Sequence, residues 1–163
     1  MVSPKLLCLV PLLLVLAATA GRAGERREFF KVFPIGTVEK KDGVTRLRIA
    51  DKFAPALEGL DGFSHVVVLY WFDKNDTPAK RGILQVHPRG NRKNPLTGVF
   101  ACRAPVRPNL IALSVCRVLA VEGSVVRVDG IDAFDGTPIL DLKPHIPAIE
   151  CPKGVTLPAW LGK

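Results

Sequence analysis

Two strand-like apolar runs constrain the fold of this chain more than any other part of its sequence. They cover residues 110–121 and 125–131, with the polar segment 103–109 before them and the loop 132–138 after them. Apolar runs bounded by Gly, Pro and Asp are typical of strands in a β protein. Binding and catalytic residues often lie on loops that a rigid sheet holds in place. We therefore predict a β fold whose functional surface is formed by these two polar segments.

Other segments predict the remaining elements of a single domain, which a length of 163 residues favours. The Asp42-Gly43 dipeptide predicts a hairpin turn between a strand within residues 30–38 and the alternating strand 44–49, because Asp-Gly tolerates the positive φ of such turns. Residues 63–72 predict a strand buried on both faces. Apolar residues at helical spacing predict one short helix: Phe53, Ala56, Leu57 and Leu60.

Three stretches of the chain resemble sequence words of the TrmO (TsaA-like) family, in the same order. GVFACRAPVRPNLIALS, at residues 98–114, is similar to GVFATRSPxRPNPIG, and IDAFDGTPILDLKPHIP, at 131–147, is similar to DxxDGTPxxDxKPY. LEGLDGFSH, at 57–65, is similar to LEGLEGFSH. The resemblance covers residues 33–147. It implies a mostly β fold, a small single-sheet β-barrel with one or two short helices, that forms a homodimer.

The same resemblance implies an activity and a cofactor site. The activity is S-adenosylmethionine-dependent methylation of N6 of threonylcarbamoyladenosine in tRNA. Such a transfer needs donor and acceptor held in line rather than a protein nucleophile, so no catalytic residue is predicted. Guanidinium groups suit carboxylates and phosphates, and carboxylates can hold ribose hydroxyls or a ligand ammonium. The implied cofactor-binding residues are His65, Val66, Arg103, Leu113, Asp132, Ala133, Phe134 and Asp135.

Structural roles are the alternatives for several of these residues. His65 could be a core imidazole satisfied by a backbone group. The arginines of the segment 103–109 could simply bind neighbouring carbonyl groups. Asp135 could cap the turn that it forms with Gly136, and we expect this to be the larger part of its role.

A basic loop after the short predicted strand 84–87 is the candidate RNA-binding element. The segment 89–95 has three cationic residues and no acid, and the whole chain has a formal net charge of +8. Cationic side chains that neutralise phosphates provide affinity independent of sequence. A solvated hairpin tip is the alternative. The predicted RNA contacts are Arg89, Arg92, Lys93 and Arg107.

Cysteine and histidine spacing predicts no zinc or other metal site. Cys102 and Cys116 flank the polar segment 103–109, so they could form a disulfide in an exported protein. Free thiols are the alternative reading. Asp141 and Lys143 stand two residues apart on a predicted strand, on one face, and predict a structural ion pair.

The N-terminal segment predicts export to the periplasm or the medium. Lys5, an apolar run at residues 6–16 and small residues up to residue 23 have the layout of a signal peptide, and the run is too short for a membrane span. We expect a signal peptide at 1–23, a linker at 24–32, the barrel at 33–147 and a Pro-rich tail at 148–163. A mis-called start, with a cytoplasmic product, is the alternative. Trp160 and Leu161 are expected to dock on the domain surface.

The chain also departs from the family pattern near its beginning and within the shared words. Many relatives carry a longer segment with the word Pro-Arg-Gln after the first strand, whereas this chain continues from Gly36 into a tight turn. His145 and Cys102 stand where the family has Tyr and Thr. These departures bear on cofactor affinity more than on the fold. They favour, as the alternative function, an exported barrel that binds a ligand but has lost or redirected the transfer activity; a purely structural barrel is a third reading.

Overall fold

A closed antiparallel sheet dominates the computed structural model of this protein. The structure describes residues 30–161. The predicted signal peptide and residues 24–29 of the predicted linker therefore lie outside the described residues. Residues from Val32 onward belong to one compact unit, to which the description below applies.

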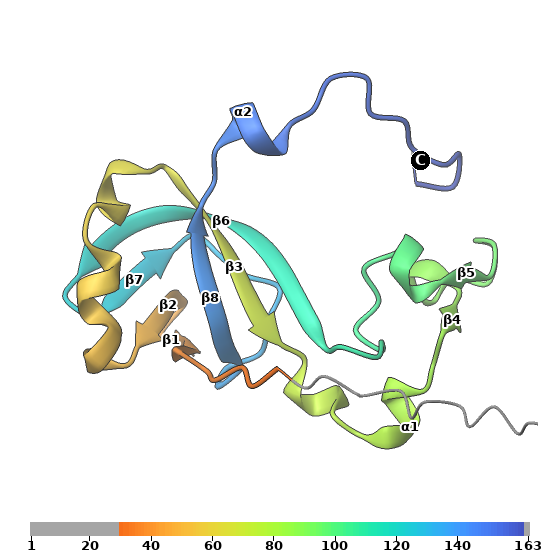
Figure 1. Cartoon of the computed structure of the whole chain (residues 1–163), viewed down its shortest axis with the longest axis horizontal. Helices are drawn as coiled ribbons and strands as arrows, with labels where there is room; N and C mark the ends of the chain where they lie inside the picture. The colour runs from red at the N-terminus through yellow and green to blue at the C-terminus, as the bar shows by residue number, and fades with distance from the viewer. Residues whose placement is uncertain (1–29, 162–163) are drawn as a thin grey trace, which may run out of the picture. The chain divides into compact units, whose positions relative to one another are not determined.

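The barrel has six strands, each hydrogen-bonded to two neighbours (Figure 1). Their order around the barrel is β1-β2-β7-β6-β3-β8, and β8 pairs with β1 to close the sheet. The resemblance implied this barrel, and the structure confirms it. The strands are β1 (Gly36–Lys41), β2 (Val44–Ile49), β3 (His65–Trp71), β6 (Ile111–Glu122), β7 (Val125–Val128) and β8 (Pro138–Pro144).

The predicted hairpin joins β1 to β2. Lys41 pairs with Val44, which leaves Asp42 and Gly43 as the two turn residues. Both have positive φ, 53° and 71°, as a two-residue hairpin turn requires. On the outer face of the hairpin the Glu39 carboxylate binds the Arg48 guanidinium at 2.5 Å.

The core is made by inward-facing aliphatic side chains from every barrel strand. Leu47, Val66, Val68, Val126 and Ile139 are fully buried there. In β6 alternate residues point inward, so that Ala112 and Cys116 are buried while their sequence neighbours are exposed. Burial of this aliphatic surface is the main favourable contribution to folding.

The predicted helix around residues 53–60 is wrong in type and length. The structure has two 3-10 helices there, η1 (Asp51–Leu57) and η2 (Leu60–Gly62). Pro55 lies inside η1 and lacks a backbone N–H, and Gly59 takes φ 79° between the two helices, so an α-helix cannot continue through this segment. Leu57 and Leu60 are nevertheless buried, as their spacing predicted.

The two α-helices of the described residues have four residues each, α1 (Pro78–Arg81) and α2 (Pro147–Glu150). Between α1 and β6 the chain forms a two-stranded sheet, β4 (Gln85–Val86) and β5 (Thr97–Gly98), with the 3-10 helices η4 (Pro88–Gly90) and η5 (Val99–Ala101). The tail after α2 leaves the end of β8 and extends toward this small sheet (Figure 1). A further 3-10 helix, η3 (Asp73–Asn75), follows β3.

The cysteines of the described residues are free thiols. Cys116 is buried in the barrel, whereas the Cys102 thiol lies 3.6 Å from the Gly98 carbonyl. The Cys102–Cys116 disulfide considered from the sequence is therefore not formed. The predicted ion pair on β8 is confirmed, with Lys143 Nζ 2.7 Å from Asp141 Oδ2. Across residues 30–161, none of the helices has both the length and the apolar character that crossing a membrane requires.

Candidate functional site

A cleft of about 710 Å³ opens at the end of the barrel where β3 finishes and β6 begins. The segment before β6 provides Arg103 and Arg107, and the loop between β7 and β8 provides Asp132. The two polar segments predicted to form the functional surface therefore line one cleft. Its other walls are aromatic, aliphatic or hydroxyl-bearing, and they include Tyr70, Phe72, Phe100, Leu113, Ser114 and Ile131.

The arginine segment is held in place by a side chain from α1. Arg81 donates a hydrogen bond to the Pro108 carbonyl at 2.9 Å and another to Asp76 at 2.7 Å. Its guanidinium also lies over the Trp71 ring, 5.3 Å from the ring centre. Asp76 in turn accepts a hydrogen bond from the Trp71 indole at 3.0 Å. This cluster, which we call the Arg81 clamp (Trp71, Asp76, Arg81 and Pro108), anchors the residue that follows Arg107.

The electrostatics of the Arg81 clamp are those of a partly exposed ion pair. The Arg81 guanidinium, and then the Trp71 indole, hold the pKa of Asp76 below its usual value. The same hydrogen bond raises the pKa of Arg81. Asp76 is therefore ionised at neutral pH, and it keeps Arg81 oriented toward Pro108.

The acidic loop is held by the buried phenol of Tyr70. The Tyr70 hydroxyl donates a hydrogen bond to the Asp132 backbone carbonyl, a residue 62 positions later in the chain. Ser114 Oγ lies 3.2 Å from the same hydroxyl. Burial raises the pKa of Tyr70, so the phenol keeps its proton at neutral pH and can act as this donor. The backbone of the loop is thus tied to the end of β3 while the Asp132 side chain stays exposed.

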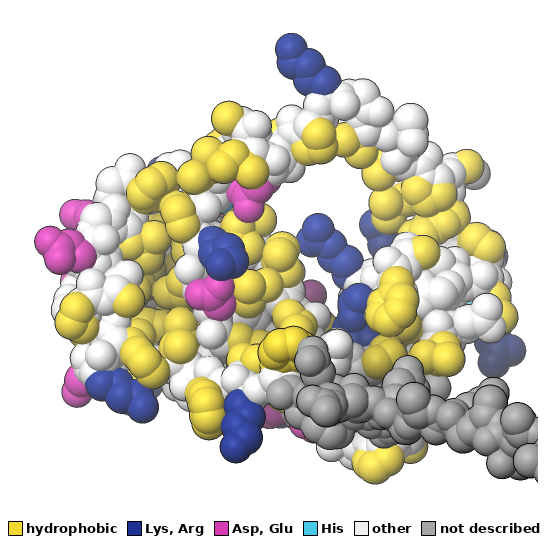
Figure 2. Space-filling model, viewed as in Figure 1, with side chains coloured by type: hydrophobic (Ala, Val, Ile, Leu, Met, Phe, Trp, Pro, Cys, Tyr) yellow, Lys and Arg dark blue, Asp and Glu magenta, His cyan; other side chains and the backbone are white. Residues whose placement is uncertain are grey.

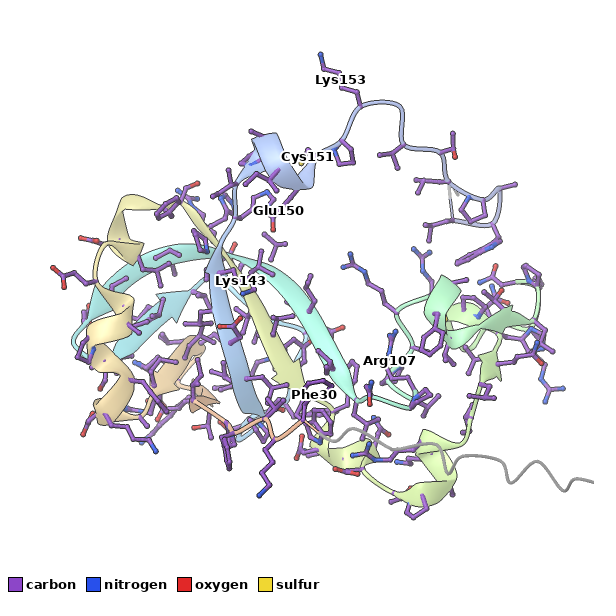
Figure 3. The ribbon with its side chains drawn as sticks, in the orientation of Figure 1. Phe30, Arg107, Lys143, Glu150, Cys151 and Lys153 are labelled. Carbon is purple, nitrogen blue, oxygen red and sulfur yellow. The ribbon has the colours of Figure 1, made fainter. Side chains whose placement is uncertain are left out.

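Three of the eight predicted cofactor residues line the cleft: Arg103, Leu113 and Asp132. Arg107, predicted from the sequence as an RNA contact, lines it as well and is half-buried. Figure 3 shows Arg107 between the barrel and the segment that carries β4 and β5. The roles of these residues in binding stay predictions.

His65 and Val66 lie away from the cleft. They begin β3, whereas Tyr70 is its next-to-last residue, and the distance along the strand from His65 or Val66 to Tyr70 is about 13–17 Å. Val66 is fully buried in the core. His65 Nδ1 is 2.9 Å from Ser64 Oγ, and the His65 ring makes an edge contact with His145, with ring centres 6.3 Å apart. The structure thus places His65 in a cluster at the opposite end of the strand.

The rest of the acidic loop also points away from the cleft. The Asp135 carboxylate accepts a hydrogen bond from the Lys40 backbone N–H at 2.8 Å, beside Gly136 with φ 79°. This bond ties the loop to β1, 95 residues away in sequence, so the capping role expected for Asp135 in its own turn stays a prediction. Ala133 packs against the core. Lys74 Nζ lies over the exposed Phe134 ring, 4.1 Å from the ring centre. These residues can shape the loop but do not face the cleft.

The basic loop divides its three cationic residues between two environments. Arg89 lines a second cleft, together with residues of η5 and the tail. Arg92 and Lys93 are exposed, and neither lines the first cleft or the second. Arg89 is therefore the one of these three residues that could contact a ligand bound in either cleft.

Sequence reasoning missed the aromatic walls and the residues that hold the loops. Phe100 lies within the word GVFACRAP, so its place beside Cys102 and Arg103 was a usable signal. Tyr70 and Arg81 had no such signal, because their roles depend on contacts with residues far along the chain. Among the described residues, no group of three or more His, Cys, Asp or Glu side chains could hold a metal ion.

The lining residues give the cleft the means to bind and orient a ligand. Two guanidinium groups suit an anionic group, and one carboxylate suits an ammonium or hydroxyl group. The aromatic side chains offer flat apolar surface for a ring. The lining contains no histidine, and it pairs no nucleophile with a base. The fold and site thus define a small barrel domain that holds ligands through its loops.

Comparison with known proteins identifies the family. The model of the tRNA-methyltransferase O N-terminal domain family matches residues 29–151. This chain therefore belongs to that family, as the motifs predicted. A Methanocaldococcus jannaschii protein named "Probable S-adenosyl-L-methionine-binding protein" is 45% identical over 120 residues, which cover 74% of this chain and 95% of that protein.

Two methyltransferases extend the comparison. The human tRNA (adenine(37)-N6)-methyltransferase is 41% identical over 113 residues, which cover 69% of this chain and 25% of the human protein. The crystal structure of TrmO from Pseudomonas aeruginosa superposes with a TM-score of 0.62 at 29% identity and covers 79% of this chain and 62% of that chain. In both comparisons the match covers only part of the other protein, and both proteins are longer than the part that matches.

Proposed function

We propose that this protein is an S-adenosylmethionine-dependent methyltransferase whose methyl donor binds in the cleft between the arginine segment and the acidic loop. The observation that carries the proposal is the convergence of Arg103, Arg107 and Asp132 on one cleft of about 710 Å³. That volume is in the range of small-molecule sites, which is about 300–1,000 Å³. The name of the archaeal relative, which matches almost end to end, supports the same ligand.

The residues of the cleft fit the chemical groups of this donor. A guanidinium from Arg103 or Arg107 would pair with the carboxylate of the methionyl part, and Asp132 would hold its ammonium or the ribose hydroxyls. Phe72, Phe100 and Leu113 would cover the apolar faces of the adenosyl part. Bound S-adenosylmethionine supplies an electrophilic methyl group on a sulfonium, and the protein has to hold the acceptor in line with it.

The proposed acceptor is N6 of threonylcarbamoyladenosine in tRNA. The name of the human relative supports adenine in tRNA as the acceptor class. The threonylcarbamoyl group has a carboxylate of its own, and the second guanidinium of the cleft offers a partner for it. The net charge of +8 suits a polyanionic substrate.

Calorimetric titration of the full chain with S-adenosylmethionine tests the donor site. We expect saturable binding, and we expect Arg103→Ala and Asp132→Asn each to weaken it about tenfold or more, as loss of a charge-assisted hydrogen bond would. Phe134→Ala, in the same loop but outside the cleft, is the matched control and should bind normally. No heat at millimolar ligand, or unchanged affinity in both cleft variants, would contradict the proposal.

Transfer of a labelled methyl group tests the acceptor. We expect label in tRNA that carries threonylcarbamoyladenosine and none in tRNA that lacks the modification. Equal labelling of the two would show a different acceptor.

The predicted export favours a second candidate, a barrel that binds a ligand but has lost or redirected the methyltransferase activity. The signal-peptide pattern of residues 1–23 favours this reading, because neither tRNA nor the donor is expected outside the cytoplasm. N-terminal sequencing of the mature chain after cell fractionation would test export. Donor binding without methyl transfer to the modified tRNA would favour this second candidate.

The homodimer implied by the family resemblance stays a prediction. The outer face of β6 has a row of partly exposed apolar side chains, Ile111, Leu113, Val115 and Leu119, with 40–52% of each exposed. The first three also line the donor cleft, so a second subunit on this face would border that cleft. An apolar row of this kind on a sheet suits a second protein surface.

A further inference from the structure

A second cleft of about 1,010 Å³ adjoins the first on the side away from the barrel. The η4 loop forms one wall with Pro88 and Arg89, and the segment 100–106 forms another. Trp160 and Leu161, from the tail, complete it. The predicted docking of these two residues on the domain surface stays a prediction. Figure 2 shows a hollow between the barrel and the tail, with Lys and Arg side chains (dark blue) projecting into it.

The two clefts share part of their lining, so a ligand can extend from one to the other. Phe100, Cys102 and Arg103 line both. The Phe100 side chain is 79% exposed although it is large and apolar, which leaves its ring available to a ligand at the junction. Arg103 is exposed as well, and the structure gives its guanidinium no ion-pair partner among the described residues.

The charged side chains that line the second cleft are all cationic. Its charged lining residues are Arg89 and Arg103, and it has no carboxylate, in contrast to the first cleft with Asp132. Its aromatic residues are Phe100 and Trp160, with His87 nearby in the wall. Cationic groups interleaved with aromatic rings bind single-stranded nucleic acid, because the rings stack on bases while the cations neutralise phosphates.

The protein holds Arg89 in an unfavourable backbone conformation at this cleft. Arg89 has φ 59°, a left-handed conformation that costs a non-glycine residue free energy and is concentrated at functional positions. Pro88 before it is buried, and its carbonyl accepts a hydrogen bond from Asn94 at 2.9 Å. His87 Nδ1 lies 2.8 Å from the Asn94 carbonyl. These contacts hold the loop in this conformation, in which Arg89 lines the cleft.

The tail that completes this cleft lies beyond the matched family domain. The family match ends at residue 151, so Trp160 lies outside the matched range. The cleft is consequently built partly from residues inside that range and partly from residues after it.

We propose that the second cleft binds the nucleotide next to the acceptor adenosine in single-stranded RNA. The acceptor enters the first cleft, the chain passes Phe100, and the neighbouring base stacks on Trp160 while Arg89 contacts a phosphate. This inference rests on the proposed function, because it takes the first cleft as the place of the acceptor and its methyl donor. It specifies that the acceptor nucleotide lies in the first cleft and its single-stranded neighbour in the second. It also assigns RNA binding to Arg89 rather than to the basic loop as a whole.

The test is the affinity of the full chain for a fluorescently labelled single-stranded heptaribonucleotide with a central adenosine, measured by anisotropy. We expect Trp160→Ala and Arg89→Gln each to weaken binding about tenfold, the effect of one lost stacking or phosphate contact. Arg92→Gln removes the same charge from the same loop outside the cleft, and Leu157→Ala shortens an exposed side chain of the same tail. Both controls should bind within about twofold of the unchanged protein.

Trp160 fluorescence provides a second readout that does not depend on the variants' affinities. The chain has two tryptophans, and a saturating amount of oligonucleotide should quench the emission of the unchanged protein more than that of Trp160→Ala, in which only Trp71 remains. Equal losses for Arg89→Gln and Arg92→Gln, or no effect of Trp160→Ala, would overturn the inference and indicate unspecific phosphate contacts.

Failure of this inference can be told apart from failure of the proposed function. Titration with S-adenosylmethionine should give the same affinity in Trp160→Ala, Arg89→Gln and the unchanged protein, because the donor lies in the first cleft. If the protein binds S-adenosylmethionine but Trp160→Ala and Arg89→Gln leave the oligonucleotide affinity unchanged, only the inference about the second cleft is overturned. If both variants weaken oligonucleotide binding but the protein does not bind S-adenosylmethionine, the proposed function is overturned and the second cleft remains an RNA-binding site.

Discussion

Cys116 lies inside the barrel, on the inward face of β6, with only 1% of its surface exposed. Removal from water raises the pKa of its thiol from 9.0 to about 11, and the charge of Asp129 acts in the same direction. A raised folded-state pKa means that the thiol contributes its full stability below the unfolded-state pKa. This contribution is lost as the pH rises from 9 toward 11.

We therefore predict that the free energy of unfolding decreases from pH 9 to pH 11 by about 2 kcal/mol because of this thiol. In Cys116→Ala the decrease should be smaller by that amount, although the variant is less stable at every pH because it leaves a small cavity. Denaturant unfolding at a series of pH values provides the measurement, with Cys151→Ala, an exposed thiol, as the control. Parallel curves for Cys116→Ala and the unchanged protein would show that the thiol is not the cause.

Residues of the candidate site differ in how far the sequence could identify them. Arg103 and Asp132 stand in unusual motif words, and both line the cleft. His65 stands in an equally good word and lies at the far end of β3. A motif shows which residues belong together in a family, but the distance between their side chains depends on where each strand begins and ends.

The Arg81 clamp belongs to the scale of elements, because it ties α1 and the end of β3 to the segment before β6. The stack of Arg81 on Trp71 and its hydrogen bonds to Asp76 and Pro108 join four positions that are not adjacent in sequence. Of the clamp, the sequence singled out only the segment 103–109, which contains Pro108. The clamp determines the position of the arginine segment without lining the cleft itself.

We predict that Arg81→Ala reduces the affinity for S-adenosylmethionine about threefold to tenfold, because the Pro108 carbonyl loses its donor and the arginine segment becomes mobile. The free energy of unfolding should fall by about 1–2 kcal/mol. Lys80→Ala, one position earlier on α1, is the control, since Lys80 bonds to Lys74 and Asn75 instead. Equal donor affinity in Arg81→Ala and the unchanged protein would exclude a positioning role, even if stability fell.

For the whole molecule, closure of the barrel depends on the place where β1 meets both β2 and β8. Gly36 pairs with Ile49 on one side and with Ile139 on the other. A Cβ atom at Gly36 would lie 2.1 Å from the Arg48 carbonyl oxygen, which is backbone and cannot give way without moving the strand. The β1–β8 contact is the shortest of the barrel, with two residue pairs.

We predict that Gly36→Ala destabilises the protein by about 2–3 kcal/mol, the cost of forcing strands apart in a packed sheet. Gly62→Ala is the matched control, because nothing lies within 4 Å of the added Cβ there. Thermal unfolding followed by circular dichroism would compare the two. If Gly36→Ala unfolds at the temperature of the unchanged protein, the closure is less tightly packed than the structure shows.

The sequence by itself determined most of the barrel strands, the Asp42-Gly43 hairpin and the two loops that carry charge, because alternation, turn propensity and motif words are local properties of the chain. The first strand is the exception, since β1 spans Gly36–Lys41 and residues 30–35 before it are not in a strand. It also indicated the family, and with it the barrel. Only the tertiary structure decided that Tyr70 and Arg81 hold those loops, that His65 lies away from the cleft, and that Trp160 completes a second cleft. Each of these depends on contacts between residues distant in sequence, which follow from strand register and barrel closure rather than from any local pattern.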